Sequence, residues 1–339
     1  MFANLLQRSK KPRAGRTIKH DINQEDAKPI EIDGRGPIWS VAFLADGKHV
    51  LSGSQEGKIR RWRVEDGKQV GTPMDGGSAV LSIAVSRDGK WVVSGMDSGL
   101  VTVWNAESHS KVTEWKAHNN EVWVVDVSPD GTRIATGSKG HTLCVWSLST
   151  GERLLGPVKH DYYVAAVKFS PDGRLIATAT WERDSVRVYD SQGGLLVEFP
   201  VTVGSPLSLA WASDSKRLFA LSDNGDIHCL DVSTGIVLSK WATHSSDDAG
   251  CIALASNGMF IAASASSSVS FWDTTTHKRI GTVIKQTHDV KSMAVSANYD
   301  LVIGGDTTIS LLRLRDILPS RYFDNVRASA LKNSCDITF

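Results

Sequence analysis

Apolar and polar residues alternate along most of the chain, in short runs separated by clusters of Gly, Asp, Ser and Asn. Residues 122–155, VWVVDVSPDGTRIATGSKGHTLCVWSLSTGERLL, hold three such runs, and the turn sequences PDG, SKGH and STG separate them. Alternation with a period of two and many β-branched residues are typical of β-strands. Because no part of the repeats has an apolar period of 3.6 residues over ten positions, the chain is predicted to be all-β.

This pattern recurs about every 42 residues. An apolar strand followed by Asp-Gly or a related turn occurs seven times, at Asp46, Asp88, Asp130, Asp172, Asp214, Asn257 and Asn298. After each turn an alternating strand ends in a large residue, at Trp62, Trp104, Trp146, Tyr189, Leu230, Trp272 and Leu312. A fourth short strand, such as Thr113 to Trp115, leads into the next repeat. Four antiparallel strands per repeat describe one propeller blade, so seven copies predict a seven-bladed β-propeller of four-stranded antiparallel blades.

The repeats resemble the WD-repeat family. The resemblance is carried by Phe169-Ser-Pro-Asp-Gly173, by Leu51-Ser-Gly-Ser54 leading to Trp62, by Phe271-Trp-Asp273, and by histidines ahead of the first strand, and it covers roughly residues 30 to 315. In that family an N-terminal strand completes the last blade. Ile30-Glu-Ile32 precedes the first full repeat and the last repeat stops after its third strand, so the resemblance implies that this strand closes the ring.

Three segments are expected on this basis. Residues 1–26 form a basic, disordered N-terminal arm, residues 27–316 form the propeller, and residues 317–339 form a C-terminal tail that is partly helical or disordered. In the tail, the apolar stripe of Tyr322, Val326 and Ala330 predicts one or two helical turns that pack across the ring.

The resemblance implies a structural role for the histidines. In WD-repeat proteins a His ahead of the first strand joins a buried hydrogen-bonded chain with a Ser or Thr on the second strand, an Asp in the next turn and a Trp on the third strand. Such chains satisfy buried polar groups. The matching residues are His160, Thr178 and Asp184 with Tyr189 in place of Trp, His118, Thr136 and Trp146 in the third repeat, and Ser52 and Trp62 in the first.

The resemblance also implies a partner-binding face. In the family, this face is lined by two residues near the start of the first strand of each repeat and by one residue just before the Asp position in the turn after the second strand. By position, the predicted residues are Trp39, Gln55, Leu81, Asp97, Glu121, Trp123, Lys139, Tyr163, Arg183, Leu207 and Asp223, with Trp181 in an insertion near Arg183. Large aromatic and Arg side chains dominate interface energies, so Trp39, Trp123, Tyr163 and Arg183 are the preferred anchors. The alternative is that each aromatic ring packs on its neighbours within the protein.

Composition excludes several other functions. The four Cys, at 144, 229, 251 and 335, match neither zinc nor short disulfide spacing, which favours reduced thiols in a cytoplasmic or nuclear protein. No apolar run approaches the ~18 residues of a membrane span. Phosphate-binding, nucleophile-elbow, zinc-protease and EF-hand motifs are absent from the sequence. We therefore expect no catalysis, no metal, no cofactor and no membrane insertion.

The charge is unevenly distributed. Lys and Arg number 38 against 37 Asp and Glu, but residues 1–20 hold six basic residues and no acid. Within this arm Lys10, Lys11, Arg13 and Arg16 form a weak nuclear-localisation or phosphate-contact pattern. A mitochondrial presequence and a plain solvated arm are the alternatives.

These observations predict a non-enzymatic scaffold for protein or peptide partners, acting as a monomeric subunit of a larger complex. The first alternative is a chromatin- or RNA-associated subunit that uses the basic arm. The second is a ubiquitin-ligase substrate receptor, although the W-D-x-R signature is missing after Trp62, Trp104, Trp146 and Trp272. A propeller hydrolase or isomerase would need convergent acids in the central channel, and the sequence indicates none.

Overall fold

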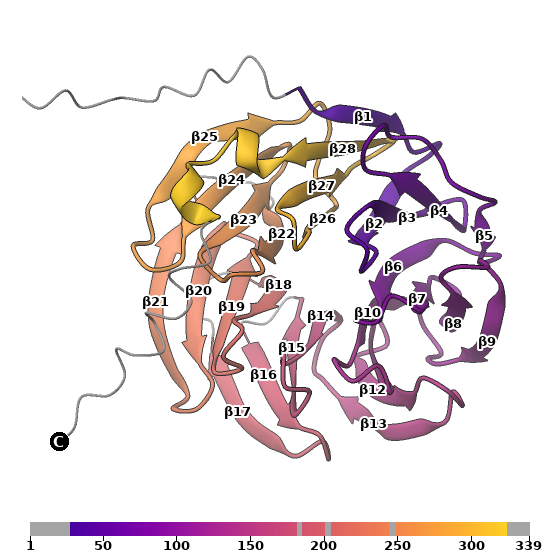
Figure 1. Ribbon diagram of the computed structural model, residues 1–339. Helices are drawn as coiled ribbons and strands as arrows, with labels where there is room; N and C mark the ends of the chain where they lie inside the picture. Colours follow the sequence, from indigo (N-terminus) through magenta and orange to yellow (C-terminus); the bar gives the residue numbers. More distant parts are fainter. Residues whose placement is uncertain (1–27, 182–184, 201–204, 244–248, 324–339) are drawn as a thin grey trace, which may run out of the picture.

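Strands arranged around a central axis make up almost all of the structure (Figure 1). The computed structural model describes residues 28–181, 185–200, 205–243 and 249–323. Seven separate four-stranded sheets form a ring, and neighbouring strands within each sheet run antiparallel. The predicted seven-bladed propeller is confirmed, and we number the blades 1 to 7 in chain order.

The first four blades follow one another without overlap along the chain. Blade 1 contains β2 (Ile38–Phe43), β3 (His49–Ser54), β4 (Lys58–Arg63) and β5 (Met74–Asp75). Blade 2 contains β6 (Val80–Val85), β7 (Trp91–Met96), β8 (Leu100–Asn105) and β9 (Lys111–Lys116). Blade 3 contains β10 (Val122–Val127), β11 (Arg133–Ser138), β12 (Thr142–Ser147) and β13 (Arg153–Lys159). Blade 4 contains β14 (Val164–Phe169), β15 (Leu175–Thr180), β16 (Ser185–Asp190) and β17 (Leu195–Pro200).

The remaining three blades complete the ring. Blade 5 contains β18 (Pro206–Trp211), β19 (Arg217–Ser222), β20 (Asp226–Asp231) and β21 (Ile236–Ala242). Blade 6 contains β22 (Ala249–Leu254), β23 (Phe260–Ala265), β24 (Ser268–Asp273) and β25 (Arg279–Lys285). Blade 7 contains β26 (Ser292–Val295), β27 (Asp300–Gly304), β28 (Thr308–Arg313) and, as its outer strand, β1 (Ile30–Asp33).

The two ends of the propeller meet in blade 7. Strand β1 pairs antiparallel with β28, with Ile30 opposite Leu311 and Ile32 opposite Ile309. The predicted closure by the N-terminal strand is therefore confirmed (Figure 1). Closure joins the first blade to the last, so the ring has no open end whose apolar surface would face solvent.

The apolar core lies between neighbouring blades. Alternate side chains of each sheet point toward the next sheet, as the period-two pattern requires. Where two blades come closest, the second strand carries glycine: a Cβ atom on Gly95 would lie 2.7 Å from Val122, and one on Gly137 would lie 2.6 Å from Val164. Glycine at these positions lets the next blade approach, which fixes the spacing around this side of the ring.

The antiparallel strands give the ring two different faces. The segments that join the first to the second strand and the third to the fourth strand lie on one face, which we call the turn face. The segments that join the second to the third strand, and the fourth strand to the next blade, lie on the opposite face, which we call the loop face. In blade 1 the Asp46–Gly47 turn is therefore on the turn face, and residues 55–57 are on the loop face.

A short C-terminal segment covers part of the turn face. It contains two 3₁₀ helices, η1 (Leu314–Asp316) and η2 (Ser320–Tyr322). Tyr322 Oη donates a hydrogen bond of 3.0 Å to Asp273, and Asn257 Nδ2 donates one of 2.8 Å to the Tyr322 carbonyl. Tyr322 is buried in this contact. The other members of the predicted stripe, Val326 and Ala330, lie outside the described residues, and the proposed segment boundaries stay a prediction.

Candidate partner-binding face

One backbone hydrogen bond is repeated on the loop face of five blades. It joins the carbonyl before the first strand to the amide after the second strand, over 2.9–3.1 Å. The pairs are Pro37 with Gln55, Ala79 with Asp97, Glu121 with Lys139, Tyr163 with Trp181, and Ser205 with Asp223. This register places Trp181, not Arg183, at the position that the sequence alignment gave to Arg183. Arg183 itself lies outside the described residues.

Aromatic side chains from blades 3 and 4 meet on this face. Trp123, at the start of β10, lies 5.4 Å from Tyr163 and 6.0 Å from Trp181 between ring centroids, and both contacts are edge-to-face. Edge-to-face contacts of this kind stabilise aromatic pairs beyond the burial of their area. Trp181 remains 43% exposed, and Trp123 and Tyr163 are half-buried. Three residues predicted for the face thus form one contiguous surface.

Two further rings extend this surface. The ring of His141 lies 5.1 Å from Tyr163, edge-to-face, and 6.5 Å from Tyr162, nearly parallel. We call Trp123, His141, Tyr162, Tyr163 and Trp181 the aromatic cluster. Sequence analysis missed His141 and Tyr162. Tyr162 precedes a predicted residue directly, whereas His141 follows a β-turn and is brought to the cluster only by the contact between blades.

An ion pair lies at the edge of the aromatic cluster. Lys139 Nζ is 2.9 Å from Glu121 Oε1 and 5.9 Å from the centre of the Trp123 ring, and Trp123 Nε1 donates a 2.7 Å hydrogen bond to Glu121 Oε2. Partial burial alone would raise the pKa of Glu121, but the bonds from Lys139 and Trp123 hold it below its usual value. The bond to Glu121 in turn raises the pKa of Lys139. The polar groups beside Trp123 are therefore satisfied within the protein.

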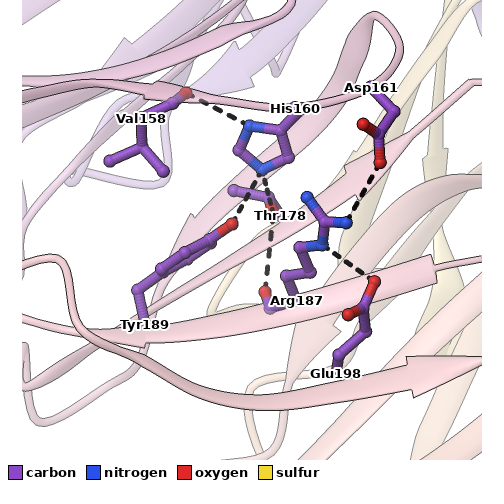
Figure 2. Close-up of polar contacts among 7 residues, drawn as sticks. All are labelled: Val158, His160, Asp161, Thr178, Arg187, Tyr189 and Glu198. Carbon is purple, nitrogen blue, oxygen red and sulfur yellow. Dashed lines mark hydrogen bonds and ion pairs between the residues drawn. The ribbon is translucent and has the colours of Figure 1, made fainter.

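The buried hydrogen-bonded chain of blade 4 is shown in Figure 2. His160 Nε2 lies 3.1 Å from Thr178 Oγ1 and 3.1 Å from Tyr189 Oη, and Nδ1 lies 3.3 Å from the Val158 carbonyl. A carbonyl only accepts, so Nδ1 carries the proton, and the single lone pair of Nε2 accepts one hydroxyl proton. Thr178 Oγ1 also donates to the Arg187 carbonyl over 3.5 Å. Three of the four predicted members are thus joined, and the fourth, Asp184, lies outside the described residues.

Blade 3 contains a similar hydrogen-bonded chain, but its last member is a Thr on the third strand. His118 Nε2 lies 2.7 Å from Thr136 Oγ1, and Trp146 Nε1 donates a 2.9 Å hydrogen bond to the same hydroxyl. His118 Nδ1 lies 2.8 Å from Thr142 Oγ1. Thr142, on the third strand, takes the place that an Asp has in the family pattern, and sequence analysis did not identify it. In blade 1, Trp62 Nε1 donates to Ser52 Oγ over 2.8 Å, as the alignment predicted.

Comparison with known families agrees with these chains. The family model described as WD domain, G-beta repeat matches residues 29–63, 67–105, 109–147 and 154–190. The chain belongs to the WD-repeat β-propeller family. The four matched segments of this WD-repeat protein run from the closing strand β1 to β16, the third strand of blade 4, and the later blades have the same four-stranded antiparallel sheets. A search of curated proteins found no match. WD-repeat propellers are in general non-enzymatic scaffolds for protein interactions.

Burial keeps the chain histidines of this WD-repeat protein neutral. Both His118 and His160 are 6% exposed, and burial lowers the pKa of each to about 4, with a smaller contribution from Arg153 and Arg187 respectively. Arg187 is itself paired with Glu198 at 2.9 Å and Asp161 at 3.3 Å (Figure 2). A buried, neutral and fully bonded imidazole suits a structural role rather than proton transfer.

The other predicted face residues of the WD-repeat ring lie away from the aromatic cluster. Trp39, in blade 1, is 38% exposed and donates a 2.7 Å hydrogen bond from Nε1 to Gln55. Asp223 Oδ1 accepts a 2.9 Å bond from the Ser205 amide. The remaining predicted residues are half-buried Leu81, exposed Asp97 and half-buried Leu207. The basic-arm residues Lys10, Lys11, Arg13 and Arg16 lie outside the described residues.

Metal and thiol chemistry have no candidate site in the described part of the chain. Within residues 28–181, 185–200, 205–243 and 249–323, no group of three or more His, Cys, Asp or Glu side chains is placed to hold a metal ion. Burial raises the pKa of the Cys144 and Cys251 thiols to about 11, which keeps them protonated at neutral pH. No helix in the described residues is long and apolar enough to cross a membrane.

Proposed function

We propose that this WD-repeat protein is a non-enzymatic interaction scaffold that holds a protein or peptide partner on its loop face, at blades 3 and 4. The observation that carries this proposal is the contact of Trp123 with Tyr163 and Trp181, which joins residues from two blades into one partly exposed aromatic surface. Tyr and Trp are enriched among residues that dominate binding energy at protein interfaces.

The electrostatics of the aromatic cluster support a peptide or protein partner. Glu121 is already bonded to both Lys139 and Trp123, so a partner need not satisfy these groups when it excludes water. What remains accessible is aromatic surface, above all on Trp181. Such a surface gains free energy from apolar burial and edge contacts, with polar groups at its border.

The scaffold holds this surface in place before binding. The backbone bonds from the Lys139 amide to Glu121 and from the Trp181 amide to Tyr163 tie the second strand of each blade to the start of its first strand. Side chains held in this way lose little conformational freedom on binding, which favours affinity. The buried chains of His118 and His160 stiffen the same two blades.

Alanine substitutions in the aromatic cluster test this proposal. Full-length wild type, Trp123→Ala and Tyr163→Ala are used as baits for affinity capture from cell lysate, and the captured proteins are quantified by mass spectrometry. Val112→Ala is the matched control, because Val112 is 51% exposed but lies on the outer strand β9. We expect the main partner to be depleted at least about tenfold with both cluster variants and retained with the control. Unchanged capture by both cluster variants would overturn the proposal.

The basic arm and the ligase-receptor alternatives have no support among the described residues and stay predictions. Loss of RNA or DNA binding with rising salt, abolished by deletion of residues 1–20, would favour the first alternative over a pure protein scaffold.

A further inference from the structure

The aromatic cluster is a connected series of rings in which blade 3 and blade 4 alternate. In order, the rings are those of Trp181, Trp123, Tyr163, His141 and Tyr162. Neighbouring ring centroids are 5.1–6.5 Å apart, and the first three contacts are edge-to-face, with interplanar angles of 66–73°. Rings that meet at such angles do not form one flat platform. The accessible surface therefore consists of separate ring faces and edges.

Two hydrogen-bond donors in this series have no partner within the part of the chain that the structure describes. They are Trp181 Nε1 and Tyr163 Oη. Trp181 is 43% exposed and Tyr163 is half-buried, so neither side chain is enclosed by the protein. An indole nitrogen only donates, whereas a phenol hydroxyl donates and accepts. A ligand that excludes water from these rings must therefore supply hydrogen-bond acceptors, because an unpaired buried donor costs free energy.

The acceptors beside these rings are already used. Glu121 Oε1 accepts from Lys139 Nζ over 2.9 Å, and Glu121 Oε2 accepts from Trp123 Nε1 over 2.7 Å. The main-chain carbonyl of Glu121 accepts from the Lys139 amide, and that of Tyr163 accepts from the Trp181 amide. The aromatic cluster thus presents two free donors among apolar ring surfaces, with its neighbouring carboxylate satisfied.

Three kinds of peptide ligand differ in the acceptors that they offer to such a surface. The main-chain carbonyls within a helix are bonded inside the helix, so a helix lying on the cluster leaves both donors without a main-chain acceptor. An added β-strand needs unpaired main-chain groups at a strand edge, whereas the amides of Lys139 and Trp181 are already bonded. A polyproline II segment has no internal hydrogen bonds, and proline has a carbonyl but no amide donor. Its carbonyls are therefore free to accept from both donors.

The dimensions of a polyproline II helix also suit the series of rings. The helix has three residues per turn and rises about 3.1 Å per residue, so residues two apart are separated by about 6 Å along its axis. This is close to the spacing of neighbouring rings in the aromatic cluster. Two of the three residues in each turn can face one surface, and pyrrolidine rings pack well on the faces of Trp and Tyr side chains.

We propose that the aromatic cluster binds a proline-rich segment of the partner in the polyproline II conformation. The carbonyls of this segment accept hydrogen bonds from Trp181 Nε1 and Tyr163 Oη, and its pyrrolidine rings pack on the aromatic faces around Trp123. This inference rests on the proposed function, since it names the kind of segment that the same cluster holds.

A peptide of ten prolines is the probe. The fluorescein-labelled decaproline peptide is titrated with the full-length protein and followed by fluorescence anisotropy. We expect saturable binding with a Kd of about 100 μM or below. A peptide of five Gly-Ser repeats has the same length and free carbonyls, but it is flexible and lacks pyrrolidine rings. It is expected not to bind.

Matched variants test the two donors separately from the rings. The double substitution Trp181→Phe/Tyr163→Phe removes both donors and keeps an aromatic ring at each position, so it is expected to raise the Kd at least about fivefold. Trp39→Phe is the control, because it removes an exposed indole donor of the same face in blade 1, where Gln55 is its acceptor. It is expected to leave the Kd unchanged. None of these side chains is fully buried, so the melting temperature is expected to stay unchanged.

Three results would overturn the inference. They are no saturable binding of decaproline up to about 1 mM, equal binding of the Gly-Ser peptide, and equal binding of decaproline by wild type and the double Phe variant. The capture assay separates the inference from the proposed function. Loss of the main partner with Trp123→Ala, together with no decaproline binding, would overturn the assignment to a proline-rich segment and leave the proposed function intact. Unchanged capture, together with decaproline binding that the double Phe variant weakens, would support the inference and overturn the role of the cluster in holding the main partner.

Discussion

Blades 3 and 1 have the same four-stranded fold, but their buried polar side chains differ. In blade 3, His118 and Trp146 both bond to the hydroxyl of Thr136, and His118 also reaches Thr142 on the third strand. The buried hydroxyl, indole and imidazole thereby satisfy one another.

Blade 1 has the bond between the indole and the hydroxyl, but it lacks the histidine. Trp62 donates to Ser52, but Gly34 stands at the repeat position of the histidine. On the third strand of this blade, the 6% exposed Arg60 pairs with Glu56 through Nη2 at 3.0 Å. The comparison teaches that the bond between the third-strand Trp and the second-strand hydroxyl is common to both blades, whereas the histidine that extends it in blade 3 is replaced by glycine in blade 1.

Removing the shared Trp is expected to have the largest effect. Trp146→Ala in blade 3 deletes a buried ring and leaves Thr136 without its donor, so the free energy of unfolding should fall by about 3–5 kcal/mol. Trp62→Ala in blade 1 should cost a similar amount, and half-buried Trp123→Ala on the loop face should cost about 1 kcal/mol or less. Urea denaturation followed by circular dichroism measures all three. If blade 1 tolerated the loss of Trp62, the bond would not be a common requirement.

Acid should weaken blades 3 and 4 through their buried histidines. The pKa of His118 and of His160 is about 4 in the folded protein, against about 6.5 in an unfolded chain. Below pH 6.5 the unfolded chain therefore binds protons that the folded ring does not, and the free energy of unfolding falls as the pH drops toward 4. The loss reaches up to about 3 kcal/mol per histidine. Thermal unfolding between pH 7 and 4 should show a flatter profile for His118→Gln/His160→Gln. An equal slope for wild type and variant would contradict this assignment.

In blade 1, the free energy of unfolding should depend more on Glu56, the partner of Arg60, than on Arg60 itself. Glu56→Ala leaves the guanidinium of buried Arg60 without its ion pair, which should lower the free energy of unfolding by about 1–3 kcal/mol. Arg60→Met removes the charge and fills a similar volume, so it should be close to neutral. Chemical denaturation of both variants, with the double variant to complete the cycle, checks this. A larger loss for Arg60→Met than for Glu56→Ala would reverse the interpretation.

The smallest expected effect is at the isolated tryptophan of the blade 1 loop face. Trp39 is exposed and bonds only to neighbouring Gln55 among its described hydrogen bonds, so Trp39→Ala should change the free energy of unfolding by less than about 0.5 kcal/mol. It should also retain the partner that Trp123→Ala loses. Differential scanning calorimetry and the capture assay measure the two properties. Loss of the partner with Trp39→Ala would extend the proposed site to blade 1.

Much of the ring follows from local pattern. The turns at Asp46 and Asp88 and the alternating strands beside them predict blades, because strand and turn signals depend on neighbouring residues. The closing strand at Ile30–Asp33 was predictable from the resemblance, since the last repeat lacks its outer strand. The chain from His160 to Tyr189 was predictable in the same way.

The candidate site was predictable only in part. Trp123 and Tyr163 were identified by their repeat positions, but the contacts of His141 with Tyr162 and Tyr163 depend on how blade 4 sits against blade 3. Trp181 was assigned to an insertion, whereas the Tyr163 carbonyl holds it at the regular position. When the strand pairing is unknown, an alignment of the repeats places an inserted residue at the wrong point. The pairing itself is set only in the folded sheet.

The sequence by itself determined the number of blades, their strand order and the positions of the buried Trp and His residues, because these follow from a 42-residue period and from period-two alternation. The tertiary structure decided which side chains of neighbouring blades meet. It joined Trp123, Tyr163 and Trp181 into one surface. It also paired Ile280 with Phe271 and buried it, while Leu238, at the same repeat position, is an exposed bulge residue. The physical reason is that a repeat encodes each blade alike, whereas contacts between blades and with the C-terminal segment form only when the ring has closed.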